Sequence, residues 1–221
     1  MQERQEKLLK IIVKEYIKTA EPVSSGFLVR KFRLPFSSAT VRNEMAKLEE
    51  DGYIYQPHTS AGRIPTEKAY HFYIKNALVR KKVKSNTELQ QQHDEISLKN
   101  TAKDLAEKSG LAVFWSTDKN NSHYTGISNL LSQPEFLDTQ EVLNFSKIID
   151  DIDNIVLDIY SHVSNEPEIL IGRKNPFGAS CSSIVVKYQD GDNQRMFGIV
   201  GPMRMDYEQC LGLINFILNK L

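Results

Sequence analysis

Residues 37–63, SSATVRNEMAKLEEDGYIYQPHTSAGR, decide the fold expected for the first part of this chain. Ser37 and Ser38 supply hydroxyls that can accept from the free amides of a first helical turn, so a helix is predicted to begin there. Gly52 is expected to end it. Between these points apolar residues recur with the spacing of one helical face, which predicts a buried stripe made of Val41, Met45 and Leu48.

The opposite face of this predicted helix is small and polar. It carries Ala39, Asn43 and Ala46, with Thr40, Arg42 and Lys47 at its margins. Small residues let a helix lie close to base edges, whereas Asn and Arg side chains can bind bases or phosphates. The acidic residues at 49–51 gather at the C-terminal end, where a helix inserted by its N-terminus would hold them away from phosphate. This face is therefore a candidate for reading a DNA groove.

A β-hairpin is expected directly after the helix, because 53–55 is β-prone and 56–62 is rich in turn residues. The pattern predicts a winged helix-turn-helix domain over residues 1–84. We expect Arg42 and Asn43 to read bases, and Lys47 and Arg63 to hold the DNA backbone. The complete predicted DNA-binding set is Ser38, Ala39, Thr40, Arg42, Asn43, Lys47, His58, Thr59, Ser60, Gly62 and Arg63. The alternative interpretation is an ordinary amphipathic helix followed by a surface loop.

Flanking helices should complete this domain. Residues 3–19 place apolar side chains on one side of a first helix. A short second helix, capped by Ser24 or Ser25, should turn Leu28, Val29 and Phe32 inward, and its basic residues at 30–33 either contact phosphate or only solvate the helix. A long helix is predicted from 65–66 to about residue 84, with its aromatic residues at 70–73 in the core rather than forming a platform for bases.

Residues 37–73 (SSATVRNEMAKLEEDGYIYQPHTSAGRIPTEKAYHFY) resemble the winged-helix DNA-binding domain of the HrcA family of bacterial heat-shock repressors. The resemblance resumes in ISNLLSQPEF at 127–136, IGRKNPFGASCSSIVV at 171–186 and FGIVGPMRMDY at 197–207. It implies a C-terminal GAF-like domain, an inverted-repeat operator upstream of chaperone genes, a homodimer, and the GroEL-type chaperonin as co-regulator. The family carries an inserted dimerisation domain where only residues 116–123 stand in this chain, which makes this a shortened form.

Charge divides the chain. Residues 1–84 hold 17 Lys and Arg against 9 Asp and Glu, and residues 85–221 hold 11 against 19, so a total charge of zero hides halves of +8 and −8. The basic half is the expected nucleic-acid half. The two cysteines lack metal-ligand spacing, the N-terminus is not a signal peptide, and no apolar run reaches membrane-spanning length, so we expect a cytoplasmic protein with no membrane partner.

Residues 85–109 are polar and charged with thinly spread Leu89, Ile96, Leu98 and Leu105, which favours a helical, solvated linker over a core helix. Residues 110–221 then alternate β-prone runs at 111–116, 124–128, 167–172, 181–188 and 195–201 with helical spacing at 139–163 and about 206–221. The turn at 189–192 predicts a hairpin. The expected fold class is α+β, with a reduced, mostly antiparallel GAF-like sheet in this regulatory domain.

Nothing in the sequence predicts catalysis, a metal site or a cofactor. No phosphate-binding loop or metal-ligand spacing is present, and the acids at 150, 151 and 153 follow a helical pattern typical of a solvated face. We therefore expect a non-enzymatic, sequence-specific repressor of heat-shock genes that is released on heat stress. One alternative is a small-molecule sensor in which the loop 175–178 lines a pocket of the GAF-like domain; another is a protein-interaction module, which the basic charge of the first half disfavours.

Overall fold

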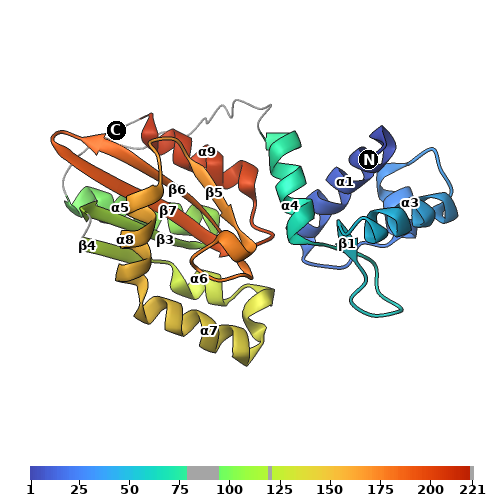
Figure 1. Ribbon diagram of the computed structural model, residues 1–221, viewed down its shortest axis with the longest axis horizontal. Helices are drawn as coiled ribbons and strands as arrows, with labels where there is room; N and C mark the ends of the chain where they lie inside the picture. The colour runs from blue at the N-terminus through green and yellow to red at the C-terminus, as the bar shows by residue number, and fades with distance from the viewer. Residues whose placement is uncertain (79–94, 119–120, 220–221) are drawn as a thin grey trace. The chain divides into compact units, whose positions relative to one another are not determined.

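The computed structural model describes residues 1–78, 95–118 and 121–219, with the side chains at 77 and 95–97 left out of the description. Contacts between Cα atoms divide the chain into two compact units, Met1–Lys81 and Lys82–Leu221. Helices and antiparallel strands occur in both units, so the chain belongs to the α+β class (Figure 1). The two units are described separately below.

The first unit is mainly helical. Its elements are α1 (Glu3–Thr19), α2 (Ser25–Phe32), α3 (Ser38–Glu50), β1 (Ile54–Tyr55), β2 (Ile64–Pro65), α4 (Glu67–Tyr73) and the π-helical turn η1 (Ile74–Leu78). β1 and β2 pair antiparallel and form the predicted hairpin directly after α3. Of the long helix predicted to reach residue 84, only the part ending at Leu78 falls within the described residues.

Local capping explains where α2 and α3 begin and end. The Ser24 hydroxyl accepts from the Phe27 amide at 3.3 Å, and the Ser37 hydroxyl accepts from the Thr40 amide at 3.1 Å. These bonds satisfy amides that have no partner inside the helix. Gly52 has a φ of +74°, which a residue without a Cβ adopts at little cost, and it follows the end of α3 as predicted.

The core of the first unit contains the predicted stripe of α3. Val41, Met45 and Leu48 expose 3% or less of their surface. Tyr70 and Tyr73 are also buried, so the interpretation of these two aromatic residues as core is confirmed. Phe32 was expected to face inward and is instead 37% exposed. It is the last residue of α2, where the chain turns through Arg33 at a φ of +47°, and the Lys31 ammonium lies 5.8 Å from its ring centroid.

The second unit contains a five-stranded antiparallel sheet in the order β4-β3-β7-β6-β5 (Figure 1). The strands are β3 (Ala112–Asp118), β4 (Asn121–Thr125), β5 (Glu168–Ile171), β6 (Cys181–Asp190) and β7 (Asn193–Pro202). β6 and β7 pair along their whole length from Cys181↔Pro202 to Asp190↔Asn193, and Gly191 in the turn has a φ of +58°. The hairpin predicted at 189–192 is therefore confirmed.

Helices cover both faces of this sheet. Figure 1 shows α6 (Ile127–Leu131) and α7 (Thr139–Asp150) on one side and α9 (Tyr207–Leu218) on the other. The first side buries Phe114, Phe145 and Val185, together with residues of η2 (Pro134–Leu137) and α8 (Ile152–His162). Because both faces are covered, β3 and β6 are buried along nearly continuous runs and show no alternation of buried and exposed residues.

Two expectations for the second unit are wrong. Residues 95–109 form α5 (Glu95–Ser109), which packs on β3 and α9 and buries Ala102, Leu105 and Ala106 to 3% exposure each, so this part of the expected solvated linker is a core helix. Its apolar positions are few, but small alanines let the helix approach the sheet closely. Residues 126–128 do not continue a strand either, because Gly126 adopts a φ of +75° and begins α6.

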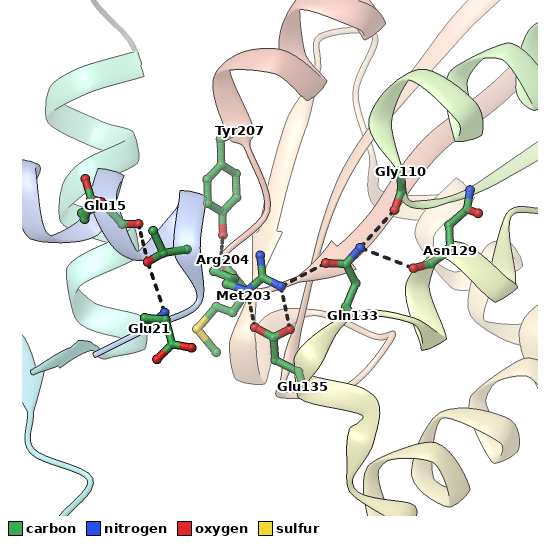
Figure 2. Close-up of polar contacts among 10 residues, drawn as sticks. Glu15, Glu21, Gly110, Asn129, Gln133, Glu135, Met203, Arg204 and Tyr207 are labelled. Atoms are coloured by element: carbon green, nitrogen blue, oxygen red, sulfur yellow. Dashed lines mark hydrogen bonds and ion pairs between the residues drawn. The ribbon is translucent and has the colours of Figure 1, made fainter. Parts of the chain in front are cut away.

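A polar network holds η2 against the segment after β7 (Figure 2). Arg204 donates from Nε to Glu135 Oε1 at 2.6 Å and from Nη2 to Gln133 Oε1 at 3.0 Å. The Gln133 amide in turn donates to the Gly110 carbonyl at 3.2 Å. The partly buried Arg204–Glu135 ion pair joins segments that lie far apart in the sequence. Its bidentate guanidinium-carboxylate geometry fixes the orientation of these segments.

Candidate nucleic-acid interface

Helix α3 presents its polar face to solvent. Ser38, Ala39, Arg42, Asn43 and Lys47 are exposed. Thr40 is half-buried, and its hydroxyl lies 2.9 Å from that of Ser37. The buried stripe on the opposite side anchors the helix, so these side chains form a regular outward surface that can approach a partner without disturbing the core.

The hairpin loop at 56–63 is also exposed at its tip, through His58, Thr59 and Ser60. It is closed from inside by Gln56, whose side-chain amide donates to the Thr59 carbonyl at 2.9 Å and to the Ala61 carbonyl at 2.8 Å. His58 Nδ1 lies 3.2 Å from the Ser60 hydroxyl. The loop therefore has an internally hydrogen-bonded shape while its tip still offers polar groups to solvent.

Helix and hairpin share a groove of about 440 Å³. Arg42 lines it from α3, Thr59, Ser60, Gly62 and Arg63 line it from the loop, and Ser24 and Ser25 line it from the start of α2. The structure thus brings five of the predicted residues together around one concave, largely polar surface. Ser38, Ala39, Asn43 and Lys47 lie on α3 outside the residues that line this groove.

Arg63 has a structural partner that local sequence patterns do not reveal. Its Nε donates to Glu49 Oε2 at 2.8 Å, and only 18% of its side chain is exposed. Its backbone pairs with that of Val23 through two hydrogen bonds of 2.9 Å. Arg63 therefore joins the hairpin to α3 and to the segment before α2, whereas its sequence context predicted only a contact with the DNA backbone.

Gly62 is required by packing within the protein. A Cβ at this position would lie 2.5 Å from the Val23 carbonyl carbon and 2.6 Å from its oxygen, distances that backbone atoms cannot accommodate without moving. Gly62, predicted from the sequence as a DNA contact, thus allows the backbone of a neighbouring segment of the same unit to approach closely.

We expect Gly62→Ala to destabilise the first unit by roughly 1–3 kcal/mol even in the absence of DNA, because the hairpin must move away from Val23. This corresponds to a fall of several degrees in melting temperature, measured by circular dichroism. Gly26→Ala is the matched control, since its Cβ would meet only Arg30 Nη1 at an ordinary 3.6 Å inside α2. An unchanged melting temperature for Gly62→Ala would show that the hairpin accommodates a side chain at this position.

A buried acid on α3 was also missed. Glu44 exposes only 6% of its side chain, pairs with Arg4, and lies 3.9 Å from Lys47 Nζ. A clue was present, because residue 44 falls at the i+3 position of the stripe that begins at Val41. The period predicted burial there, but the acidic residue type predicted exposure. The buried Glu44 carboxylate therefore offsets part of the positive charge of Lys47.

Three further features of the described residues concern metal ligands, thiols and membrane-spanning helices. No group of three or more potential metal ligands is found among the described residues, where Asp150, Asp151 and Asp153 are exposed. Burial raises the pKa of Cys181 to about 12 and raises that of Cys210 further, so neither thiol is a reactive thiolate in the folded chain. No described helix is long and apolar enough to cross a membrane.

The fold and the interface thus define a two-unit α+β protein with an exposed helix and a donor-rich hairpin loop on its first unit. Residues 37–211 match the family model described as HrcA protein C terminal domain. This match covers well over half of the chain, and the chain therefore belongs to the HrcA family.

Individual relatives match over a shorter stretch. The heat-inducible transcription repressor HrcA of Chloroflexus aurantiacus is 55% identical over 78 residues, which cover 35% of this chain and 21% of the relative. That of Acetivibrio thermocellus is 58% identical over 74 residues, covering 34% and 21%. The aligned stretch spans about a fifth of the length of these curated relatives.

A solved structure shares the fold over nearly the whole chain. The crystal structure of a hypothetical protein, determined at 2.2 Å resolution, superposes with a TM-score of 0.83 and 23% sequence identity, covering 99% of this chain and 97% of that one. At this identity the likeness concerns the fold alone.

Proposed function

We propose that this chain is a sequence-specific, DNA-binding transcription repressor of heat-shock genes. The observation that carries the proposal is the groove in which Arg42 of α3 meets Thr59 and Ser60 of the hairpin loop. The net charge of +8 on residues 1–84 supports it, since phosphate attraction needs a basic surface. Relatives named heat-inducible transcription repressor support the choice of genes.

In this proposal residues 1–84 are a winged helix-turn-helix domain in which α3 is the recognition helix and 56–63 the wing. The order helix, helix, helix, hairpin supports this assignment. Residues 110–221 are a reduced GAF-like regulatory domain, supported by the antiparallel sheet with helices on both faces. The eleven residues predicted from the sequence remain the proposed DNA contacts, with Arg63 and Gly62 acting first as structural residues of the wing.

The proposed partners follow from family membership. The operator is an inverted repeat in double-stranded DNA, bound by a homodimer in the cytoplasm, and heat stress releases it. A GroEL-type chaperonin is the proposed co-regulator. Heat release has a physical basis in the marginal stability of domains of this size, for which a few kcal/mol decide the folded fraction.

A fluorescence-anisotropy titration with a random duplex at about 50 mM and about 200 mM salt tests DNA binding. The affinity should fall by orders of magnitude between the two conditions, because each neutralised phosphate releases counterions. The same titration on the duplex that the protein selects from a random library, repeated at rising temperature, tests heat release. Binding without salt dependence, or none at all, would contradict the proposal.

The alternative of a small-molecule sensor has one observation in its favour. A pocket of about 290 Å³ in the second unit is lined by Phe136, Phe145, Phe177 and Glu141, and it includes Gly178 of the predicted loop. Apolar walls with few polar groups are typical of ligand sites. A ligand of this pocket should raise the melting temperature of the whole chain and change its affinity for the selected duplex. A rise in melting temperature with unchanged DNA affinity would show that ligand binding does not control the repressor function.

A further inference from the structure

The wing is not held in place by its own strands. β1 and β2 contribute only the pairs Ile54↔Pro65 and Tyr55↔Ile64, and Pro65 has no amide to donate. A two-stranded ribbon is marginal in water even when it is longer than this. The position of the loop at 56–63 relative to α3 must therefore be decided by other contacts (Figure 1).

One carboxylate supplies these contacts at both ends of the loop. Glu49, in the last turn of α3, accepts from the Gln56 backbone amide through Oε1 at 3.0 Å and from Arg63 Nε through Oε2 at 2.8 Å. The pair is only partly exposed, with 33% of the Glu49 side chain and 18% of the Arg63 side chain accessible. Charge-assisted bonds of this kind are stronger and more directional than those between neutral groups.

Further bonds tie the loop to itself and to the segment before α2. The Gln56 side-chain amide closes the loop onto the Thr59 and Ala61 carbonyls. The Arg63 backbone pairs with Val23, just before α2. Glu49 thus joins the last turn of α3 directly to both ends of a loop that is also hydrogen-bonded to itself.

We propose that Glu49 is a positioning residue that sets the wing against the recognition helix and thereby determines DNA specificity. This inference rests on the proposed DNA-binding function. An acid next to a DNA surface costs affinity by simple repulsion, so its removal should tighten binding unless the geometry that it enforces is needed. A positioning role for Glu49 therefore predicts that its removal weakens binding to the selected site, whereas simple electrostatics predicts that its removal strengthens binding.

The test compares Glu49→Gln with Glu50→Gln in the full chain. Both substitutions remove one negative charge from the same helical turn, but the Glu50 side chain is exposed and forms no hydrogen bond or ion pair with any residue that the structure describes. Binding is measured by anisotropy on the duplex that the wild-type chain selects from a random library and on a random duplex. A circular-dichroism melt establishes that each variant is folded.

Glu49→Gln should bind the selected duplex about tenfold more weakly, the loss expected for a charged hydrogen bond that aligns two contact surfaces. On random duplex it should bind as tightly as the wild type or more tightly, with a salt slope larger by about one as Arg63 becomes available to phosphate. Glu50→Gln should not weaken binding to either duplex.

The inference is overturned if Glu49→Gln matches Glu50→Gln on the selected duplex, or if it loses equally on both duplexes. Should Glu49→Gln fail to fold, Glu49→Asp replaces it, because this variant keeps the charge but is one methylene shorter and does not reach both the Gln56 amide and Arg63. It should lower selected-site affinity by at least about threefold with random binding unchanged. A wild-type chain that binds neither duplex would contradict the proposed function itself, which is a separate outcome.

Discussion

An inverted-repeat duplex should bind this chain at least about 100-fold more tightly than a duplex of equal length carrying one half-site. The proposed interface is small, since one α3 and one loop cover a single half-site. A handful of phosphate contacts supports little more than non-specific affinity at physiological salt. Two copies that touch each other make the second binding event effectively intramolecular, which removes this limit.

We expect the second unit to supply the surface for this contact. Leu105 of the once-expected linker is 3% exposed inside that unit and cannot join a partner, while Leu89 lies outside the described residues. Leu137 and Leu143 are instead 81% and 51% exposed at the η2 and α7 segment. Replacing both by Glu should reduce the advantage of the inverted repeat without changing half-site affinity.

Analytical ultracentrifugation with each duplex gives the stoichiometry that this prediction needs. Two chains should bind the inverted repeat and one the half-site. Because assembly on DNA does not require a dimer in dilute solution, the measurement is made on the complexes. Equal affinity and a single bound chain on both duplexes would show that the chain acts as a monomer.

Arg42→Ala should cost roughly 1–3 kcal/mol on the selected site and should relax specificity there. Arg42 is exposed, lines the groove between α3 and the loop, and has no acidic partner among the described residues. Its guanidinium is therefore free to form two parallel hydrogen bonds with a guanine edge, and the alanine variant loses that discrimination.

Lys47→Ala is the comparison. It should weaken binding to all sequences alike and lower the salt slope by about one unit or less, since a lysine acts on phosphate as a point charge. The loss should be small because Glu44 Oε1, 3.9 Å from Lys47 Nζ, already offsets part of that charge. Anisotropy on selected and random duplexes measures both variants, and equal losses on the two duplexes for Arg42→Ala would refute its assignment to base recognition.

Much of the architecture was accessible from local patterns. The serine caps, the stripe of Val41, Met45 and Leu48, and the turn at 189–192 each act within a few residues of the chain, so neighbouring residues suffice to predict them. The helices at 139–163 followed in the same way from their period, and α7 and α8 were found there. The exposed face of α3 was predicted by elimination, as the side that the stripe leaves to solvent.

Other features depend on contacts between distant segments, which local patterns do not contain. α5 looked solvated because its apolar residues are sparse, yet α9 and β3 close around Ala102, Leu105 and Ala106. The same holds for the start of α6, where a Cβ at Gly126 would lie 2.5 Å from the Leu111 carbonyl oxygen, so that this close approach requires glycine.

For the interface, the sequence alone determined which residue types stand on α3 and in the loop, because helical period and turn chemistry assign each side chain to a face. Only the tertiary structure decided which of these side chains are bound to other residues of the protein. Whether a charged side chain is available to DNA depends on which groups lie within a few ångströms of it in the folded chain. Arg42 lines the groove without an acidic partner among the described residues, whereas Arg63 is bound to Glu49, 14 residues earlier in the chain.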